Sequence, residues 1–159
     1  MLRISKLTDY ATVILSYLAV DPVNVLSATS IAEATHLAIP TVSKILKILS
    51  TAGLVHSFRG AGGGYQLAKP ASQITLAHVV TAVEGNIAMT ECCTPNGACM
   101  VDTLCSIKEN WQRVNHVILQ ALASLTLSDM TQPLKQHTPL LHGIPIKADS
   151  NMTGLRDGK

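Results

Sequence analysis

All four cysteines of the 159-residue chain lie between Cys92 and Cys105. Cys93, Cys99 and Cys105 are evenly spaced, with five residues between neighbours. Thiolates bind soft metals, so this spacing favours zinc, copper(I) or an iron–sulfur cluster. The sequence lacks the Cys-x-x-Cys knuckle of structural zinc sites, and its wide loops suit a group larger than one ion. A zinc-pinned loop or a plain dithiol loop is the alternative.

Three thiolates leave the fourth position of a cluster to Cys92 or to a ligand that is not a cysteine. Incomplete cysteine ligation makes a cluster labile, which suits a sensor better than an electron carrier. Clustered cysteines also differ from a secreted disulfide scaffold, in which they are spread to join distant segments. We therefore expect a reducing, cytoplasmic environment.

The N-terminal apolar run 11–20 does not resemble an export signal or a membrane span. Asp9 interrupts the approach to it, and Asp21-Pro22 follows where a small-residue cleavage site would stand. The run is also much shorter than the roughly 20 residues that a membrane span needs. No membrane partner is expected.

The glycine-rich run at residues 59–64 raises a second possibility, a phosphate-binding loop. Such a loop requires Gly-Lys-Ser/Thr, and a dinucleotide fingerprint requires a helix after its glycines. Here Gly64 is followed by Tyr65 in a predicted strand, 65–68, while another predicted strand, 54–58, precedes the run. The pattern indicates a β-hairpin instead.

Three helices are predicted before this hairpin. The first spans 7–20 and ends at Asp21-Pro22, and its apolar stripe comprises Leu7, Ala11, Ile14, Leu15 and Leu18, with Thr8 and Thr12 facing away. The second, 30–35, can be capped by Ser27 or Thr29. The third runs from Pro40 to about Ala52 and ends at Gly53, and its core stripe comprises Val42, Ile45, Leu46 and Leu49. The order predicts a mainly α fold with a two-stranded β-wing, the winged helix-turn-helix.

This module predicts binding to double-stranded DNA, because a helix fits the major groove and cations contact phosphates. Residues 1–70 carry six basic and three acidic residues, net +3, whereas the remainder carries six and seven, net −1. An aromatic content of 3% argues against a stacking platform for single strands. The candidate contacts lie on the third helix and in the hairpin turn: Thr41, Ser43, Lys44, Lys47, Arg59, Gly60 and Gly62.

The second half contains a predicted helix over 74–83, the cysteine loop at about 88–105 and a long helix to about Leu125. The seam of the long helix suits a partner helix, because its members alternate four and three residues apart: Ile107, Trp111, Val114, Ile118, Ala121 and Leu125. We expect a DNA-binding domain at 1–70, a cluster-binding loop and dimerisation helix at 71–131, and a flexible tail at 132–159.

The chain resembles the bacterial winged-helix iron–sulfur repressors that include IscR, NsrR and the regulators of SUF cluster-assembly operons. The resemblance covers roughly residues 1–131 and rests on five segments, namely 2–11, 39–47, 52–55, the wing 59–65 and the three evenly spaced cysteines. The recognition helix with its Pro40 looks most like the SUF-operon branch. The family implies a homodimer joined through the long helix and a partly palindromic DNA operator.

Carried over by position, the family's cluster ligands are Cys93, Cys99 and Cys105. IscR-like members have a histidine three residues after the last cysteine, but this chain has Lys108, a poor ligand because it is protonated near neutral pH. Asp9 matches the carboxylate that NsrR-like members donate from the other subunit, which favours a 4Fe-4S cluster over 2Fe-2S. Cys92 and Glu91 are substitutes, and the alternative role of Asp9 is a helix-capping acid.

The expected function is a cytoplasmic, homodimeric transcription regulator, a repressor of iron–sulfur assembly genes that senses through its cluster. The alternatives are a thiol- or zinc-based winged-helix regulator without a cluster, and a small iron–sulfur carrier or electron-transfer protein. No nucleophile with a base and an orienting group is evident, so no enzymatic activity is predicted.

Overall fold

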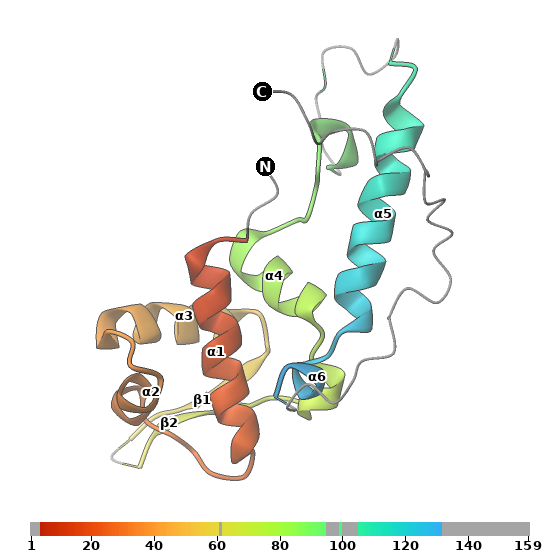
Figure 1. Cartoon of the computed structure of the whole chain (residues 1–159). Coiled ribbons are helices and arrows are strands. Elements are labelled where there is room, and N and C mark those ends of the chain that lie inside the picture. The colour runs from red at the N-terminus through yellow and green to blue at the C-terminus, as the bar shows by residue number, and fades with distance from the viewer. Residues whose placement is uncertain (1–3, 61, 95–98, 100–104, 132–159) are drawn as a thin grey trace, which may run out of the picture.

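The computed structural model describes residues 4–60, 62–94, 99 and 105–131, and the predicted tail at 132–159 lies outside them. Helices dominate, and the one sheet among these residues is a two-stranded antiparallel hairpin, as expected (Figure 1). The helices are α1 (Lys6–Val20), α2 (Ala28–Thr35), α3 (Ile39–Thr51), α4 (Leu76–Glu84), α5 (Lys108–Ser124) and α6 (Leu127–Thr131). The strands are β1 (Val55–Phe58) and β2 (Gly64–Leu67). Short 3-10 helices are η1 (Ala71–Gln73) and η2 (Glu91–Cys93).

Helix α1 is the element around which the others pack. It contacts α2, α3, α4, α6 and β2, and its predicted stripe is buried at Ala11, Ile14, Leu15 and Leu18. The predicted stripe of α3 is likewise fully buried: Val42, Ile45, Leu46 and Leu49. Because each large apolar side chain contributes about 1.5–3 kcal/mol when buried, these two stripes hold α3 on α1.

The helix ends follow local sequence signals. Ser27, rather than Thr29, caps α2, because its hydroxyl accepts a hydrogen bond from the Ser30 backbone N–H (3.1 Å). Pro40 lies in the first turn of α3, as predicted. Gly53 follows the end of that helix with φ 69°, a left-handed conformation that glycine adopts without strain. The chain then enters β1 directly.

The hairpin is held against the segment that precedes α2. Val55 pairs with Leu67 and Phe58 with Gly64, so the strands occupy 55–58 and 64–67, within one residue of the expected limits. Tyr65 and Leu26 exchange backbone hydrogen bonds of 2.8 and 3.0 Å. A Cβ at Gly64 would overlap the Leu26 carbonyl group, so this position requires glycine. The close approach fixes the wing to the helical core.

Thr8 was predicted to face away from the core, and this prediction is wrong. Its side chain is 2% exposed, and its hydroxyl donates to Glu84 Oε1 (2.5 Å). Glu84 also accepts a hydrogen bond from the Ser5 backbone N–H (3.0 Å). The donors, Thr8 first and then Ser5, hold the pKa of the Glu84 carboxyl below its usual value. The last residue of α4 is therefore joined to the N-terminus of α1, where a carboxylate also meets a favourable helix dipole.

The second half differs from the expected elements in three details. Helix α4 begins at Leu76, after η1, and its cap is Thr75. Helix α5 begins at Lys108, so Ile107, predicted as part of the seam, precedes the helix. Helix α6 was not predicted, although Thr126 and Asp129 exchange hydrogen bonds in a capping pattern that the sequence carries.

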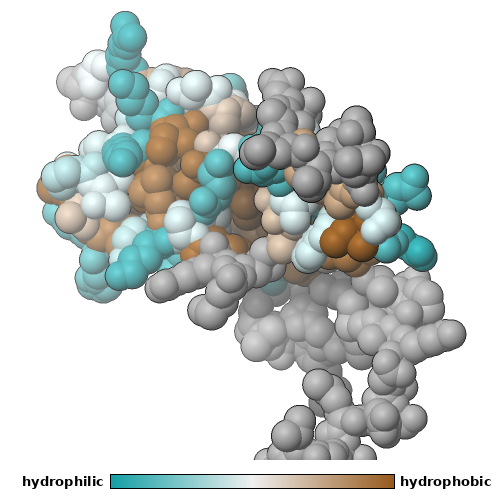
Figure 2. Space-filling view, turned by 90° about the horizontal axis from the view of Figure 1, so that it is seen from above, coloured by the Kyte–Doolittle hydropathy of each residue, from teal (hydrophilic) through white to brown (hydrophobic). Residues whose placement is uncertain are grey.

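Apolar side chains of the α5 seam lie at the surface. Trp111 is 37% exposed, Val114 43% and Ile107, just before the helix, 52%. Figure 2 shows hydrophobic residues at the surface on the α5 side of the molecule, bordered by hydrophilic ones. Within the described part of the chain, the only fully buried residue of α5 is the polar Asn115, so the apolar face of this helix remains available to a partner.

Gly64→Ala and Gly62→Ala form a matched pair that tests the close approach of the wing. Gly64→Ala should lower the free energy of unfolding by about 1–3 kcal/mol, because its Cβ overlaps the backbone at Leu26. Gly62→Ala should have little effect, since a Cβ there meets no atom within 4 Å. Urea unfolding followed by circular dichroism measures both. Equal stability of the two variants would contradict the proposed clash.

Glu84→Gln tests the contact between α4 and α1. Because the folded-state pKa of Glu84 is lowered from 4.5, its carboxylate stabilises the fold above that value, and this contribution is lost as the pH falls through the lowered pKa. Glu84→Gln should therefore be less stable than the wild type at neutral pH, and the difference should shrink in acid. Urea midpoints at neutral pH and well below pH 4.5 measure it.

Glu33→Gln is the control, because Glu33 is exposed and its side chain makes no hydrogen bond to a described residue. A Glu84→Gln difference that persisted unchanged in acid would show that the lost carboxylate is not responsible.

Candidate DNA interface and cysteine site

The face of α3 opposite its core stripe carries the residues predicted to meet DNA. Ser43, Lys44 and Lys47 are exposed, and Thr41 is half-buried. The four lie along one helix whose other side is fixed against α1, so they are held in a constant relation to one another. Such a rigid, polar helix face suits the major groove.

The predicted wing residues are also at the surface. Arg59, Gly60 and Gly62 are exposed, and Gly60 has φ 111°. The Gly63 backbone N–H donates to the Gly60 carbonyl oxygen (2.9 Å), which closes the turn. The hairpin extends to the same side of the molecule as α3 (left in Figure 1). The absence of side chains at the glycines lets a phosphate backbone approach beside the Arg59 guanidinium.

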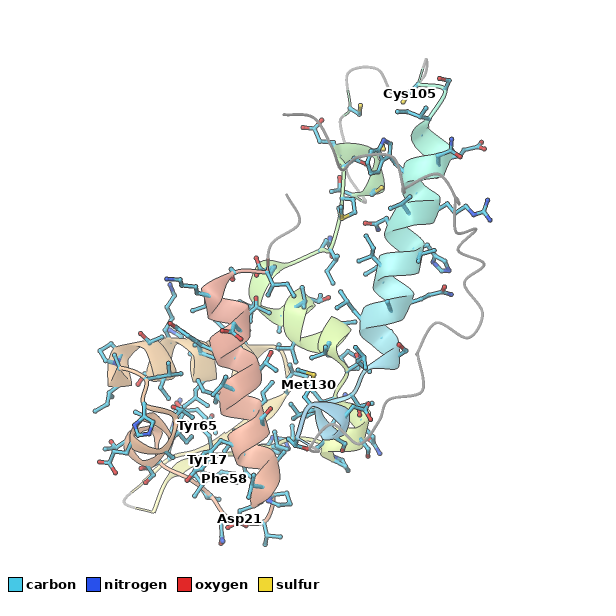
Figure 3. The ribbon with its side chains drawn as sticks, viewed as in Figure 1. Tyr17, Asp21, Phe58, Tyr65, Cys105 and Met130 are labelled. Atoms are coloured by element: carbon cyan, nitrogen blue, oxygen red, sulfur yellow. The ribbon has the colours of Figure 1, made fainter. Side chains whose placement is uncertain are left out.

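Cys92 and Cys93 lie in η2, which packs against α5. The Thr90 hydroxyl oxygen is 3.1 Å from Cys92 Sγ and 3.3 Å from Cys93 Sγ, so one hydroxyl contacts both sulfur atoms. Cys105 lies three residues before α5, at the same end of that helix as η2 (Figure 3). All four thiols are free and half-buried. Cys92, Cys93 and Cys105 are therefore accessible donors at one end of α5.

Asn115 of α5 holds the segment before η2, a role that was not predicted from the sequence. Only 7% exposed, its side-chain oxygen accepts from the Met89 backbone N–H (3.0 Å), and its amide donates to the Ile87 carbonyl oxygen (3.3 Å). Gln112, one turn earlier, donates to the Cys92 carbonyl oxygen (3.5 Å). The sequence signal that could have indicated this role is a polar asparagine next to the apolar seam of the long helix.

A cavity of about 330 Å³ lies between η2 and α5 and is lined by Cys92, Cys93 and His116, among others. Asp9 does not line it. Asp9 is exposed in the first turn of α1 and lies at a different cavity, beside Leu76 and Met130. Within the described residues, no three histidine, cysteine or acidic side chains are grouped as a metal site. Residues 95–98 and 100–104, which connect the predicted ligands, lie outside the described part.

Among the helices that the structure describes, none is both long and apolar enough to cross a bilayer.

Comparisons with known proteins agree with this arrangement. Residues 4–133 match the Rrf2 family, described as "Iron-dependent Transcriptional regulator". Protein aau3 of Rhizobium meliloti is 32% identical over 141 residues, covering 88% of this chain and 92% of that protein.

Two solved structures are similar throughout most of their length. CymR, the global cysteine regulator of B. subtilis, has a TM-score of 0.64 at 30% identity, covering 82% of this chain and 97% of that one. IscR of T. potens has a TM-score of 0.61 at 30% identity, covering 81% and 85%. The chain belongs to the Rrf2 family and is a winged-helix, DNA-binding transcription regulator rather than an enzyme.

Proposed function

We propose that the protein is a homodimeric repressor of iron–sulfur cluster assembly genes that senses through a cluster held by Cys93, Cys99 and Cys105. The observation that carries this proposal is the position of two free thiols, Cys93 and Cys105, at the start of α5, the helix whose apolar seam is exposed. The similarity to IscR and the iron-dependent description of the family support it.

The donor set fits an iron–sulfur cluster in its chemistry. Thiolates are the usual protein ligands of such clusters, and the thiols at 93, 99 and 105 are unpaired and half-buried. When bound, the cluster supplies chemistry that responds to oxygen, nitric oxide or iron–sulfur supply. A 4Fe-4S cluster is favoured, with 2Fe-2S as the alternative.

Asp9 is the proposed fourth ligand, supplied by the other subunit of the dimer. Its exposed position and the separate cavity that it lines are compatible with a ligand offered to a second chain. Cys92 is the substitute from within the same chain, since Thr90 contacts its sulfur and that of Cys93 together. Glu91, exposed in the same short helix, is the other substitute.

The dimer would form through α5. Trp111 and Val114 expose apolar surface on one face of this helix, and Ile118 continues the seam half-buried. Two copies of α3 would then meet the half-sites of a partly palindromic operator about one DNA turn apart.

Short connections join the cysteine segment to the DNA-binding half, so a structural change in the segment would be transmitted to it. Gly85 joins the segment to α4, whose last residue, Glu84, accepts hydrogen bonds from Thr8 of α1 and from Ser5, the N-cap of α1. On the other side, Cys105 is followed almost at once by α5. A change in the geometry of the thiolates would therefore shift the proposed dimer helix, α5. It would also shift α4, which contacts both α1 and α3.

A regulator that responds through thiols without a cluster is the second candidate. The similarity to CymR, which is a cysteine regulator by its description, favours it, and all four thiols are free to react. A zinc-pinned loop and an iron–sulfur carrier are the further alternatives. Iron and sulfide analysis distinguishes the zinc loop, and operator binding distinguishes the carrier.

Anaerobic purification of Cys93→Ser and Cys92→Ser tests the ligand assignment. Cys93→Ser should lose most bound iron and acid-labile sulfide, because a proposed ligand is removed, whereas Cys92→Ser should retain both. Iron and sulfide analysis with absorption and Mössbauer spectra measures the content and type of cluster. Asp9→Ala should change the spectra and make the cluster more labile.

A colourless, sulfide-free wild-type protein from iron-replete cells would exclude the cluster and favour the thiol or zinc alternative. Spectra of Asp9→Ala identical to those of the wild type would return Asp9 to a helix-capping role.

Lys44→Ala and Arg59→Ala test the DNA contacts on α3 and the wing. Each should weaken binding to the DNA upstream of the protein's own gene and reduce the salt-dependence slope by about 1, because each removes one phosphate contact. Fluorescence anisotropy across a salt series measures both. Unchanged affinity and slope in both variants would contradict this assignment of the interface. Glu33→Gln, on α2, is the surface control.

A further inference from the structure

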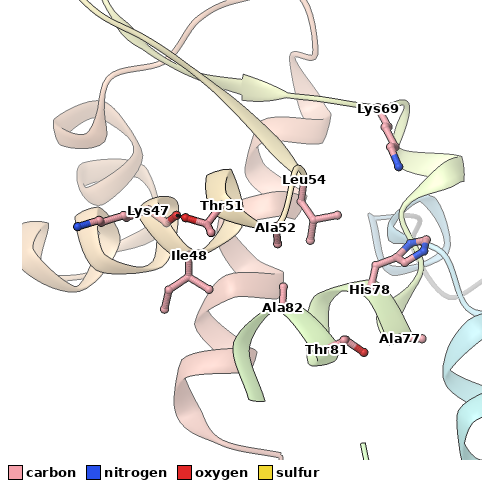
Figure 4. A pocket seen from close by; sticks show the side chains of 10 residues that line it. All are labelled: Lys47, Ile48, Thr51, Ala52, Leu54, Lys69, Ala77, His78, Thr81 and Ala82. Atoms are coloured by element: carbon pink, nitrogen blue, oxygen red, sulfur yellow. Dashed lines mark hydrogen bonds between the residues drawn. The ribbon is translucent and has the colours of Figure 1, made fainter. Parts of the chain in front are cut away.

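A cavity of about 670 Å³ lies between the C-terminal half of α3 and α4, away from the cysteines. Its apolar walls include Ile48, Leu54 and Ala82, and its polar residues include Lys47, Lys69 and His78 (Figure 4). Cavities of this size with apolar walls and a few convergent polar groups are typical of small-molecule sites. The cysteine site does not use it.

The charge of the cavity has one sign. No carboxylate is among its lining residues, and neither Lys47 nor Lys69 forms an ion pair with a described residue. Figure 4 shows the Lys69 side chain directed toward His78 across the mouth of the cavity, whereas Lys47 points outward from α3. Lys69 and His78 therefore lie together on the polar side of the cavity, next to its apolar wall.

The hydrogen bonds of α4 determine what His78 can offer to a ligand. Its Nδ1 accepts the Thr75 backbone N–H (3.1 Å) in the capping box of this helix. The proton of the neutral imidazole is therefore on Nε2, which leaves an N–H donor for another partner. An ammonium and an imidazole N–H together match the two oxygens of a carboxylate.

We propose that this cavity binds a small organic carboxylate with an apolar body. Lys69 and His78 bind the carboxylate, and the apolar body packs against Ile48, Leu54 and Ala82. The site is independent of the iron–sulfur proposal, because none of its residues belongs to the cysteine segment.

Ligand binding here would be linked to DNA binding through α3. The cavity includes Lys47 and Ile48, on the same helix as Lys44, so a bound anion neutralises positive charge beside the DNA contacts. Linkage is reciprocal, so operator DNA would weaken carboxylate binding by the same factor. The protein would thus have a second input besides its cysteines.

Titration of the isotope-labelled, DNA-free protein with phenylacetate tests the site, with phenylacetamide as the neutral probe of the same shape. We expect phenylacetate to shift the amide NMR signals of α3 and α4 at the cavity, with a Kd on the order of 1 mM, and phenylacetamide to bind more weakly. Lys69→Met removes the charge but keeps the apolar stem, and should raise the Kd about fivefold. His78→Glu retains a side chain that can complete the capping box, and should raise the Kd about tenfold through repulsion.

Lys6→Met is the matched control, because Lys6 is exposed outside this cavity, and its Kd should equal that of the wild type. Equal binding of phenylacetate and phenylacetamide would overturn the proposal by showing apolar contact alone. So would failure of phenylacetate to shift the cavity signals. If Lys69→Met weakened DNA binding but left phenylacetate binding unchanged, Lys69 would be a phosphate contact and the proposal would be wrong.

Discussion

The apolar stripe of α1 is the constraint on which the rest of the structure depends. Ile14, Leu15 and Leu18 are almost completely buried, and α1 contacts helices from both halves of the chain. The recognition helix α3 lies on one part of its surface, and α4 and α6 lie on another. Because packed interiors transmit displacement rather than absorb it, a movement of α4 relative to α1 also bears on α3.

Much of the fold was predictable because its signals are local. The stripes of α1 and α3, the glycine at 53 and the glycine-rich turn each determine the adjacent backbone. The prediction that Thr8 faces solvent was wrong, because the burial of a threonine beside an apolar stripe cannot be predicted unless its hydrogen-bond partner is known. That partner, Glu84, is 76 residues away in the sequence, and no periodicity connects them.

The sequence predicted which residues belong to the candidate site better than it predicted the contacts that surround them. Exposed positions on α3 follow from the helical period once the core stripe is known, and Lys44 is among them. The contacts of Asn115 with Met89 and Ile87 depend on how a loop returns to a helix, so spacing could not supply them. The cavity beside α3 likewise requires Lys69 and His78 to meet across segments whose relation only the tertiary structure defines.

The attachment of the cysteine segment differs in kind from that of the recognition helix. None of the described residues 86–94 is fully buried, and the segment is held on α5 by hydrogen bonds with Asn115 and Gln112. Such bonds contribute about 0.5–1.5 kcal/mol each, whereas the buried α3 stripe contributes several times more in total. A group bound at the proposed cysteine site would therefore be able to change the position of this segment without unfolding the DNA-binding core. A weakly held segment joined to a rigid DNA-binding module is the arrangement that the proposed sensing role requires.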